Sequence, residues 1–275
     1  MSIPMKEFQN NNKALKKIIH EMAETADYLW QRGWAERNAG NISVNISFCV
    51  EVETSAVDTD QSFDLPVSYP ELAGAYFMVT GTNKRMRDLA RKPEKNTLII
   101  QLNDKANGYR ILSKNAGLAN RMPTSELPTH LGIHQLIARR GGDEKVVMHT
   151  HATELIAITH AEEFCNEAAL NKLLLGMHPE TVIFVPKGIG FVPYILPGTA
   201  EIATGTLKAL QNHDVAIWEK HGVFAIGNSM GETFDIIDIL AKSAGIFLMC
   251  RSAGIHPKGF TSEQLARLKK LGSTF

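Results

Sequence analysis

The stretch Val146-Val147-Met148-His149-Thr150-His151-Ala152 joins an apolar run to the start of a helical pattern. The three apolar residues predict a short buried strand, and the residues that follow predict a helix. Side chains alternate between the two faces of an extended segment, so we expect His149 and His151 to point to the same side. Two neutral imidazoles on one face are well suited to binding Zn²⁺.

A third histidine would complete a metal site that keeps one position open for a substrate, as catalytic zinc sites do. The natural candidate is His221, in Lys220-His221-Gly222-Val223, which also lies between two short apolar segments. Spacing alone leaves a second interpretation open, because short motifs arise by chance and the chain has 10 histidines. Several others are interpreted as helix or loop residues with no partner suggested by spacing: His130, His134, His160, His178, His213 and His256.

The composition is ordinary for a soluble globular protein. Hydrophobic residues make up 44% and charged residues 21% of the 275 residues. Lys plus Arg and Asp plus Glu both number 29, so no net charge favours nucleic acid or an acidic membrane. We therefore expect a small-molecule partner, with no nucleic acid and no membrane.

The cysteines and the apolar runs indicate a cytoplasmic protein. The three cysteines are far apart and form no CxxC pair, which argues against a disulfide framework or a cysteine zinc site. The first residues contain no apolar segment of a secretory signal, and the longest apolar runs are too short to span a membrane.

Periodicity predicts helices and short strands that alternate irregularly along the chain. This order favours one α/β domain over residues 1–275, with a central, mostly antiparallel sheet flanked by helices. An N-terminal helical segment (1–33), a polar loop or insertion (51–72) and a C-terminal extension (253–275) complete it. The expected helices cover about 12–33, 123–140, 152–160, 201–210, 234–250 and a short stretch after Thr261. Thr199 is expected to cap the 201–210 helix, and Thr261–Gln264 is expected to open the last helix as a capping box. The expected strands cover 42–46, 76–79, 97–101, 108–112, 146–148, 181–185 and 214–218.

Four motifs together resemble the class II aldolase and adducin-head family. That family holds zinc with an HxH pair and a later His-Gly, which match His149-Thr150-His151 and His221-Gly222. Arg37–Ser43 resembles its N-terminal phosphate-site turn, Val79–Thr82 its second phosphate loop, and Pro123–Pro128 its catalytic glutamate motif. These motifs occur in the family's order over about residues 12–252.

Two residues depart from the family pattern. Ala39 stands where a glycine is expected in the phosphate-site turn, and its methyl group matters only if that residue needs a positive φ. Asn83 follows the Thr-Gly-Thr loop at a position where a small residue is more typical.

The resemblance implies a three-layer aldolase-like fold, a homotetramer and one Zn²⁺ per subunit. It implies that Glu126 is the general acid or base, and that Glu180 serves the aldehyde half of the substrate across a subunit interface. Without the resemblance, Glu126 is interpreted as a residue of the first helical turn, near a cap at Thr124 or Ser125. Glu180 is then interpreted as an ordinary turn residue before a strand. The implied metal ligands are His149, His151 and His221, and the implied phosphate-binding residues are Asn38, Gly40, Asn41, Thr82, Thr124 and Ser125.

Within the family, the Thr124–Pro128 sequence TSELP, the 51–72 insertion and the C-terminal extension are most similar to the branch that cleaves L-rhamnulose 1-phosphate. The products of that reaction are dihydroxyacetone phosphate and L-lactaldehyde. Enzymes for L-fuculose 1-phosphate, ribulose 5-phosphate and methylthioribulose 1-phosphate use the same scaffold and keep the three histidines, so the triad does not separate them. A non-catalytic adducin-like module is the remaining alternative, and such a module is expected to have lost metal ligands.

Overall fold

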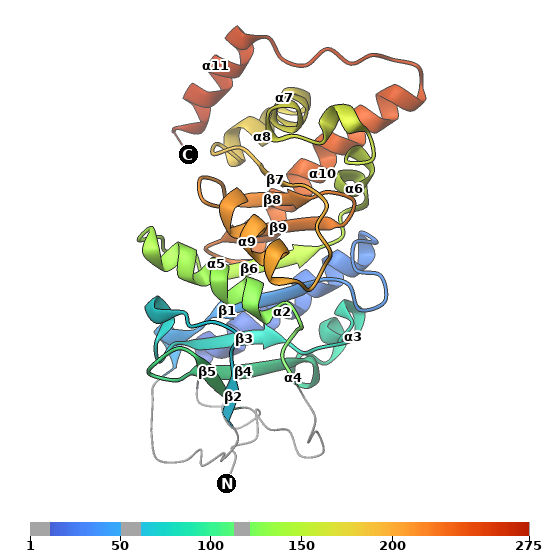
Figure 1. Ribbon diagram of the computed structural model, residues 1–275. Coiled ribbons are helices and arrows are strands. Elements are labelled where there is room, and N and C mark those ends of the chain that lie inside the picture. Colours follow the sequence, from blue (N-terminus) through green and yellow to red (C-terminus); the bar gives the residue numbers. More distant parts are fainter. Residues whose placement is uncertain (1–11, 51–61, 113–121, 275) are drawn as a thin grey trace. The chain divides into compact units, whose positions relative to one another are not determined.

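The computed structural model describes residues 12–50, 62–112 and 122–274, and these fall into two compact units (Figure 1). The first unit runs to Met148 and includes Gly227–Gly231, and the second contains His149–Ile226 and the residues from Glu232 onward. The single domain expected from the sequence stays a prediction. Among the described residues, no helix combines the length and hydropathy that a membrane crossing requires.

The first unit begins with the α2 helix (Lys13–Gln31). The Asn12 side chain caps it by accepting the Leu15 N–H at 3.0 Å, which satisfies one of the free donors of the first turn. Gly33, with φ of 74°, ends it. The helix predicted over 12–33 is confirmed, and its apolar residues at helical spacing are buried: Leu15, Ile18, Ile19, Met22, Ala26 and Leu29.

The strands of the first unit follow the order β2-β5-β4-β3-β1-β6. The β1–β3, β3–β4, β4–β5 and β2–β5 pairs are antiparallel. Strands β6 and β9 each contribute residues to both units. The strands are β1 (Asn41–Asn45), β2 (Ser62–Asp64), β3 (Tyr76–Thr80), β4 (Thr97–Leu102), β5 (Gly108–Ile111) and β6 (Val146–Thr150).

Part of the segment 51–72, predicted as a loop or insertion, forms regular structure; residues 65–69 form neither helix nor strand, and residues 51–61 lie outside the described residues. Ser62–Asp64 forms β2 because it pairs with β5, and the Phe63 ring stacks on Tyr109 with ring centroids 5.3 Å apart. Pro70–Leu72 forms the short 3₁₀ helix η2. A short polar strand carries little signal of its own, since its stability comes from the neighbouring strand.

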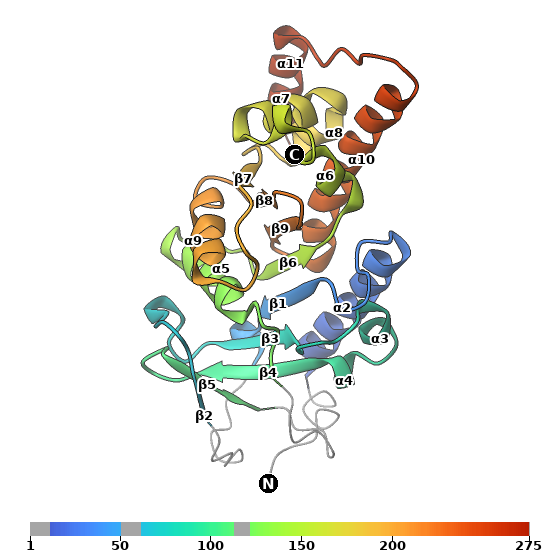
Figure 2. The ribbon, with the colours of Figure 1, turned by 45° about the vertical axis from the view of Figure 1, so that its right-hand side comes forward.

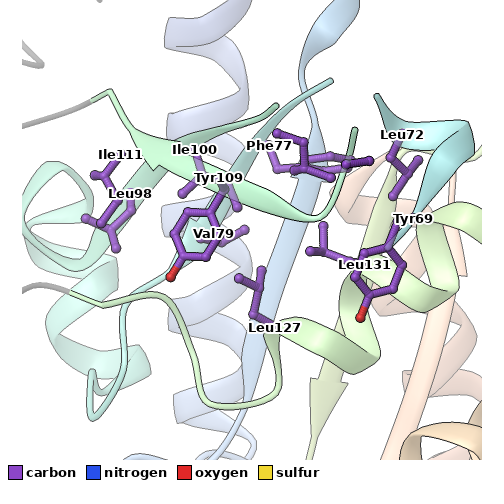
Figure 3. Close-up of a cluster of buried hydrophobic side chains, with 12 residues drawn as sticks. Tyr69, Leu72, Phe77, Val79, Leu98, Ile100, Tyr109, Ile111, Leu127 and Leu131 are labelled. Atoms are coloured by element: carbon purple, nitrogen blue, oxygen red, sulfur yellow. The ribbon is translucent and has the colours of Figure 1, made fainter. Parts of the chain in front are cut away.

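A hydrophobic cluster lies between the β3–β5 strands and the α5 helix (Leu127–Arg139), as Figure 3 shows. Alternate β3 residues, Phe77 and Val79, face this cluster, together with Leu127 and Leu131 of α5. The α2 helix packs against two short helices, α3 (Met86–Arg91) and α4 (Pro93–Asn96). The cluster fixes the start of α5, where the glutamate motif lies.

The second unit contains β7 (Gly190–Val192), β8 (Val215–Trp218) and β9 (Gly222–Gly227). Strand β8 pairs with β9 in antiparallel and with β7 in parallel orientation. In Figure 2 the α9 and α10 helices lie on opposite sides of β8 and β9. The helices of this part of the chain are α6 (Thr153–Ile158), α7 (Glu167–Met177), α8 (Pro179–Phe184), α9 (Ala200–Ala209), α10 (Met230–Ser252) and α11 (Ser262–Gly272).

The strand predicted at 181–185 is wrong, because the chain there forms the α8 helix. Pro179 occupies the first helical position, where its fixed φ favours a helix. The Thr181 hydroxyl lies 2.6 Å from the Ser243 hydroxyl of α10, and α8 packs against α7 and α11. Packing therefore overrides the strand preference of the β-branched residues.

The predicted helix caps at Thr199 and Thr261 are confirmed. The Thr199 hydroxyl accepts the Ile202 N–H, and Thr261 forms a reciprocal capping box with Gln264. The α/β class, with a mostly antiparallel sheet flanked by helices, is also confirmed.

Candidate active site

The structure brings the three predicted metal ligands together in the second unit. His149 lies in the buried strand β6, His151 follows that strand, and His221 lies in the turn between β8 and β9. Their ligand atoms all lie within 4.8 Å of one another. His149 is buried, and His151 and His221 are half-buried. The convergence predicted from the sequence is present, and the role of metal ligand stays a prediction.

The His149 imidazole is held in one orientation. Its Nδ1 lies 3.0 Å from the carbonyl oxygen of Val223, and a carbonyl can only accept a hydrogen bond. Nδ1 therefore carries the proton, which leaves the Nε2 lone pair for a ligand. The Phe224 ring stacks on this imidazole, with centroids 4.5 Å apart and an interplanar angle of 18°.

A tight turn places His221 beside the other two histidines. Lys220 adopts a left-handed conformation, with φ of 58°, and its N–H donates to the Thr159 hydroxyl at 2.8 Å. The His221 N–H donates to the Trp218 carbonyl at 3.2 Å. The Trp218 ring lies 4.9 Å from His221 and 5.1 Å from His149, and its indole N–H donates to Thr206.

Gly222 is required by the packing around the triad. A Cβ atom at this position would lie 2.5 Å from the Thr150 carbonyl oxygen and 3.1 Å from ring carbons of both His149 and His151. The His-Gly pair of the family motif thus has a physical reason here. Three converging imidazole nitrogens fit a divalent cation of intermediate softness, such as Zn²⁺.

The glutamate motif lies in the first unit, where it contacts the predicted phosphate-site turn. The Asn41 side-chain amide donates to the Glu126 carboxylate at 3.0 Å, across 85 residues of sequence. The Ile42 N–H donates to the Thr80 hydroxyl at 3.2 Å, which joins the turn to the second phosphate loop.

The second phosphate loop also pairs with the glutamate motif. Gly81 and Pro123 form an antiparallel bridge, and the Thr82 N–H donates to the Met122 carbonyl at 2.8 Å. The Thr124 N–H donates to the Thr80 carbonyl at 2.9 Å. Three motifs that are distant in the sequence are therefore joined in one part of the first unit.

Both departures from the family pattern fit the backbone. Arg37 and Gly40 have positive φ, of 49° and 82°, whereas Ala39 does not, so its methyl group causes no backbone strain. Asn83 has a φ of 56°, and asparagine tolerates this left-handed conformation better than most residues.

The predicted helix cap at Thr124 or Ser125 is wrong, because α5 begins at Leu127 and Glu126 itself occupies the cap position. The Thr124 hydroxyl instead accepts the Glu126 N–H at 3.3 Å, and Pro128 lies in the first turn. The predicted phosphate-binding residues differ in exposure: Asn38 and Ser125 are exposed, Thr82 is half-buried, and Gly40, Asn41 and Thr124 are buried. Their binding role stays a prediction.

Glu180 lies in the first turn of α8 in the second unit, with 48% of its side chain exposed. Its carboxylate lies 3.0 Å from Nε2 of His178. His178 occupies the cap position at the start of α8, which agrees with its interpretation as a helix or loop residue, and spacing did not indicate its contact with Glu180. The catalytic role predicted for Glu180 stays a prediction.

Sequence reasoning missed two histidines of α5 that are connected to the glutamate. His130 and His134 are fully or almost fully buried, and both lie within hydrogen-bond distance of the Ser43 hydroxyl. Burial lowers the pKa of each to about 3, so both are neutral at pH 7. The overlooked signal is the spacing: Glu126, His130 and His134 follow one another at four-residue steps, which places them on one helix face.

Known proteins similar to this chain include two relatives with the same name. The chain is 44% identical over 265 residues to the rhamnulose-1-phosphate aldolase of Bacteroides thetaiotaomicron, covering 96% of this chain and 97% of that protein. It is 34% identical to the rhamnulose-1-phosphate aldolase of Pectobacterium atrosepticum, covering 94% of each.

Two solved structures share the architecture. A sugar-phosphate aldolase from Thermotoga maritima superposes with a TM-score of 0.75 at 31% identity, covering 90% of this chain and 100% of that chain. An L-fuculose 1-phosphate aldolase superposes with a TM-score of 0.62, covering 94% of this chain and 97% of that chain; at 17% identity this likeness shows the fold alone.

The family match covers all the motifs described above. Residues 20–248 match the family model, a range that contains the histidine triad, Glu126 and the phosphate-site residues. This chain belongs to the family described as class II aldolase and adducin N-terminal domain.

Proposed function

We propose that this protein is a metal-dependent lyase that cleaves L-rhamnulose 1-phosphate to dihydroxyacetone phosphate and L-lactaldehyde. The observation that carries the proposal is the convergence of three imidazole ligand atoms within 4.8 Å. The 44% identity to a relative named rhamnulose-1-phosphate aldolase, over nearly the whole of both chains, supports the choice of substrate.

His149, His151 and His221 would hold one Zn²⁺ per subunit. When bound, Zn²⁺ supplies a Lewis acid that stabilises the negative charge that develops on the ketone oxygen as the C3–C4 bond breaks. The hydrogen bond from His149 to Val223 and the packing of Trp218 orient the ligands before any metal binds. No lysine Schiff base is required by this route.

Glu126 would move the proton at carbon C3. Breaking the C3–C4 bond leaves the electron pair on the dihydroxyacetone phosphate half, and protonation at C3 completes that product. The amide of Asn41 donates to the Glu126 carboxylate and orients it. In cleavage the Glu126 carboxyl group would give its proton to C3, and in the reverse, synthetic direction the carboxylate would remove that proton. Glu180 of a neighbouring subunit would take the proton of the hydroxyl that becomes the aldehyde.

The phosphate would be bound by neutral donors of the first unit. The hydroxyls of Thr124 and Ser125, which lie just before α5, are two of these donors. Gly40 and Gly81 let the backbone approach closely, and donors of the turn and the loop complete the set: Asn38, Asn41 and Thr82. We further propose a single domain, a homotetramer and a cytoplasmic location.

The test is product release from two epimeric substrates at equal concentration. Released dihydroxyacetone phosphate is measured by its reduction with NADH and glycerol-3-phosphate dehydrogenase. L-Rhamnulose 1-phosphate should give the faster release. Release from L-fuculose 1-phosphate alone would assign the chain to the sister reaction, and no release from either would overturn the proposed cleavage.

A further inference from the structure

A chain of buried hydrogen bonds leads from the Glu126 carboxylate into the interior of the first unit. Asn41 Nδ2 lies 3.0 Å from Glu126 Oε2, and the Oδ1 of the same amide contacts His130 Nε2. The Ser43 hydroxyl lies 2.7 Å from His130 Nδ1 and 2.9 Å from His134 Nε2. All four residues behind Glu126 are at most 8% exposed.

The chemistry of the donors gives this chain a direction. Asn41 presents its oxygen to His130, and an amide oxygen only accepts, so His130 Nε2 carries a proton. Because His130 is neutral, its Nδ1 carries no proton. This nitrogen therefore accepts a hydrogen bond from the Ser43 hydroxyl. That hydroxyl hydrogen is then used, so His134 Nε2 donates to the Ser43 oxygen. Every donor therefore points toward Glu126.

We propose that His130, Ser43 and His134 are positioning residues that, through Asn41, hold the Glu126 carboxyl group correctly oriented for proton transfer. This inference rests on the proposed role of Glu126. It assigns a purpose to two histidines of α5 that lie outside the family motifs quoted above.

His130 is the decisive member because it fixes the orientation of the Asn41 amide. A rotated amide would place its oxygen against the Glu126 carboxylate, where two acceptors would repel each other. The His130 N–H opposes this rotation, since an N–H can donate to an amide oxygen but not to an amide NH₂ group. Hydrogen bonds in one direction also polarise one another, which strengthens the last donor to Glu126.

The first experiment tests the direction of the chain without any assay of activity. ¹⁵N-histidine NMR of the full-length protein reports which ring nitrogen carries the proton, with His130→Gln and His134→Gln used for assignment. Both residues should be Nε2–H tautomers at neutral pH. An Nδ1–H tautomer or a protonated ring at His130 would overturn the proposal.

The second experiment compares two substitutions at His130. In His130→Gln the side-chain amide reaches the place of Nε2 and can still donate to Asn41, whereas in His130→Asn it reaches only the place of Nδ1. The Asn variant should lose about 10- to 100-fold in kcat with little change in KM, as expected for a misoriented catalytic group. The Gln variant should recover most of that loss, and both should retain the wild-type metal content.

The outcomes separate this inference from the proposed function. A wild-type enzyme without cleavage activity would overturn the function, while the tautomer measurement would still test the chain. An active enzyme in which Glu126→Gln is inactive, yet His130→Asn has wild-type kcat, would overturn the positioning role alone. If His130→Asn does not fold, Ser43→Ala takes its place and should show the same loss of kcat.

Discussion

Two groups of histidines differ in what their ring nitrogens face. One group is the triad in the second unit, and the other is the pair His130 and His134 on α5 in the first unit. In the triad, the ligand atoms face one another within 4.8 Å. On α5, the Ser43 hydroxyl lies between His130 and His134 and contacts both rings. Facing lone pairs suit a cation, whereas rings separated by a hydroxyl suit a hydrogen-bond chain.

Burial separates the two groups as well. His130 is 0% and His134 is 3% exposed, and burial lowers the pKa of each to about 3. Two members of the triad are half-buried, as a site that must admit a substrate requires. The role of a histidine in this protein depends on the groups around its ring more than on its spacing in the sequence.

The largest effect on kcat is expected at Glu126, the cap residue of α5 and the proposed proton-transfer group. Glu126→Gln keeps the size of the side chain but removes the group that moves the proton, so kcat should fall about 10²- to 10⁴-fold. Metal content should not change, because the triad is not altered. Steady-state kinetics and metal analysis of the same sample check this, and turnover like that of the wild type would remove Glu126 from the mechanism.

The α5 pair should make the stability of the protein depend on pH. Each histidine has a pKa of about 3 when folded and about 6.5 when unfolded, so the unfolded chain binds more protons between these values. The free energy of unfolding should therefore fall as pH drops below 6.5, by up to about 1.4 kcal/mol per pH unit for each histidine.

Urea denaturation at several pH values measures this dependence. The contribution is fully present above about pH 6.5 and is lost as pH falls toward the folded pKa of about 3. The His130→Gln, His134→Gln double variant should show a flatter profile than the wild type. Equal slopes for the two proteins would mean that these rings do not stay neutral in the folded state.

A smaller effect is expected at Gly222, which tests how tightly the triad is packed. A methyl group there would meet the Thr150 carbonyl at 2.5 Å, so Gly222→Ala should lower stability by about 1–3 kcal/mol and weaken metal binding. Gly231→Ala is the matched control, because nothing lies within 4 Å of its added Cβ. Similar metal affinities in the two variants would show that the triad tolerates displacement of its turn.

Much of the fold was predictable because its signals are local. The α2 helix follows from apolar spacing, and the caps at Thr199 and Thr261 follow from short polar motifs. The errors fall where packing decides: α8 carries β-branched residues but forms a helix, and β2 is a strand only because β5 lies beside it.

The candidate site was predictable in its parts but not in its connections. The HxH spacing and the His-Gly turn indicate the triad, since strand alternation places two rings together. The link from Asn41 to Glu126 joins residues 85 positions apart, and no local pattern predicts such a contact. His130 is interpreted from the sequence alone as a helix or loop residue because its partners, Asn41 and Ser43, lie on a strand that is distant in the sequence.

Metal stoichiometry tests the central claim, that three histidines of the second unit share one divalent cation. The protein is purified, loaded with Zn²⁺ and dialysed, and bound zinc is measured by elemental analysis. Wild type and His256→Ala, a substitution at an exposed histidine, should each hold about one zinc per chain, and His221→Ala should hold almost none. A wild-type protein without zinc, or a His221→Ala variant that binds it as the wild type does, would contradict this account.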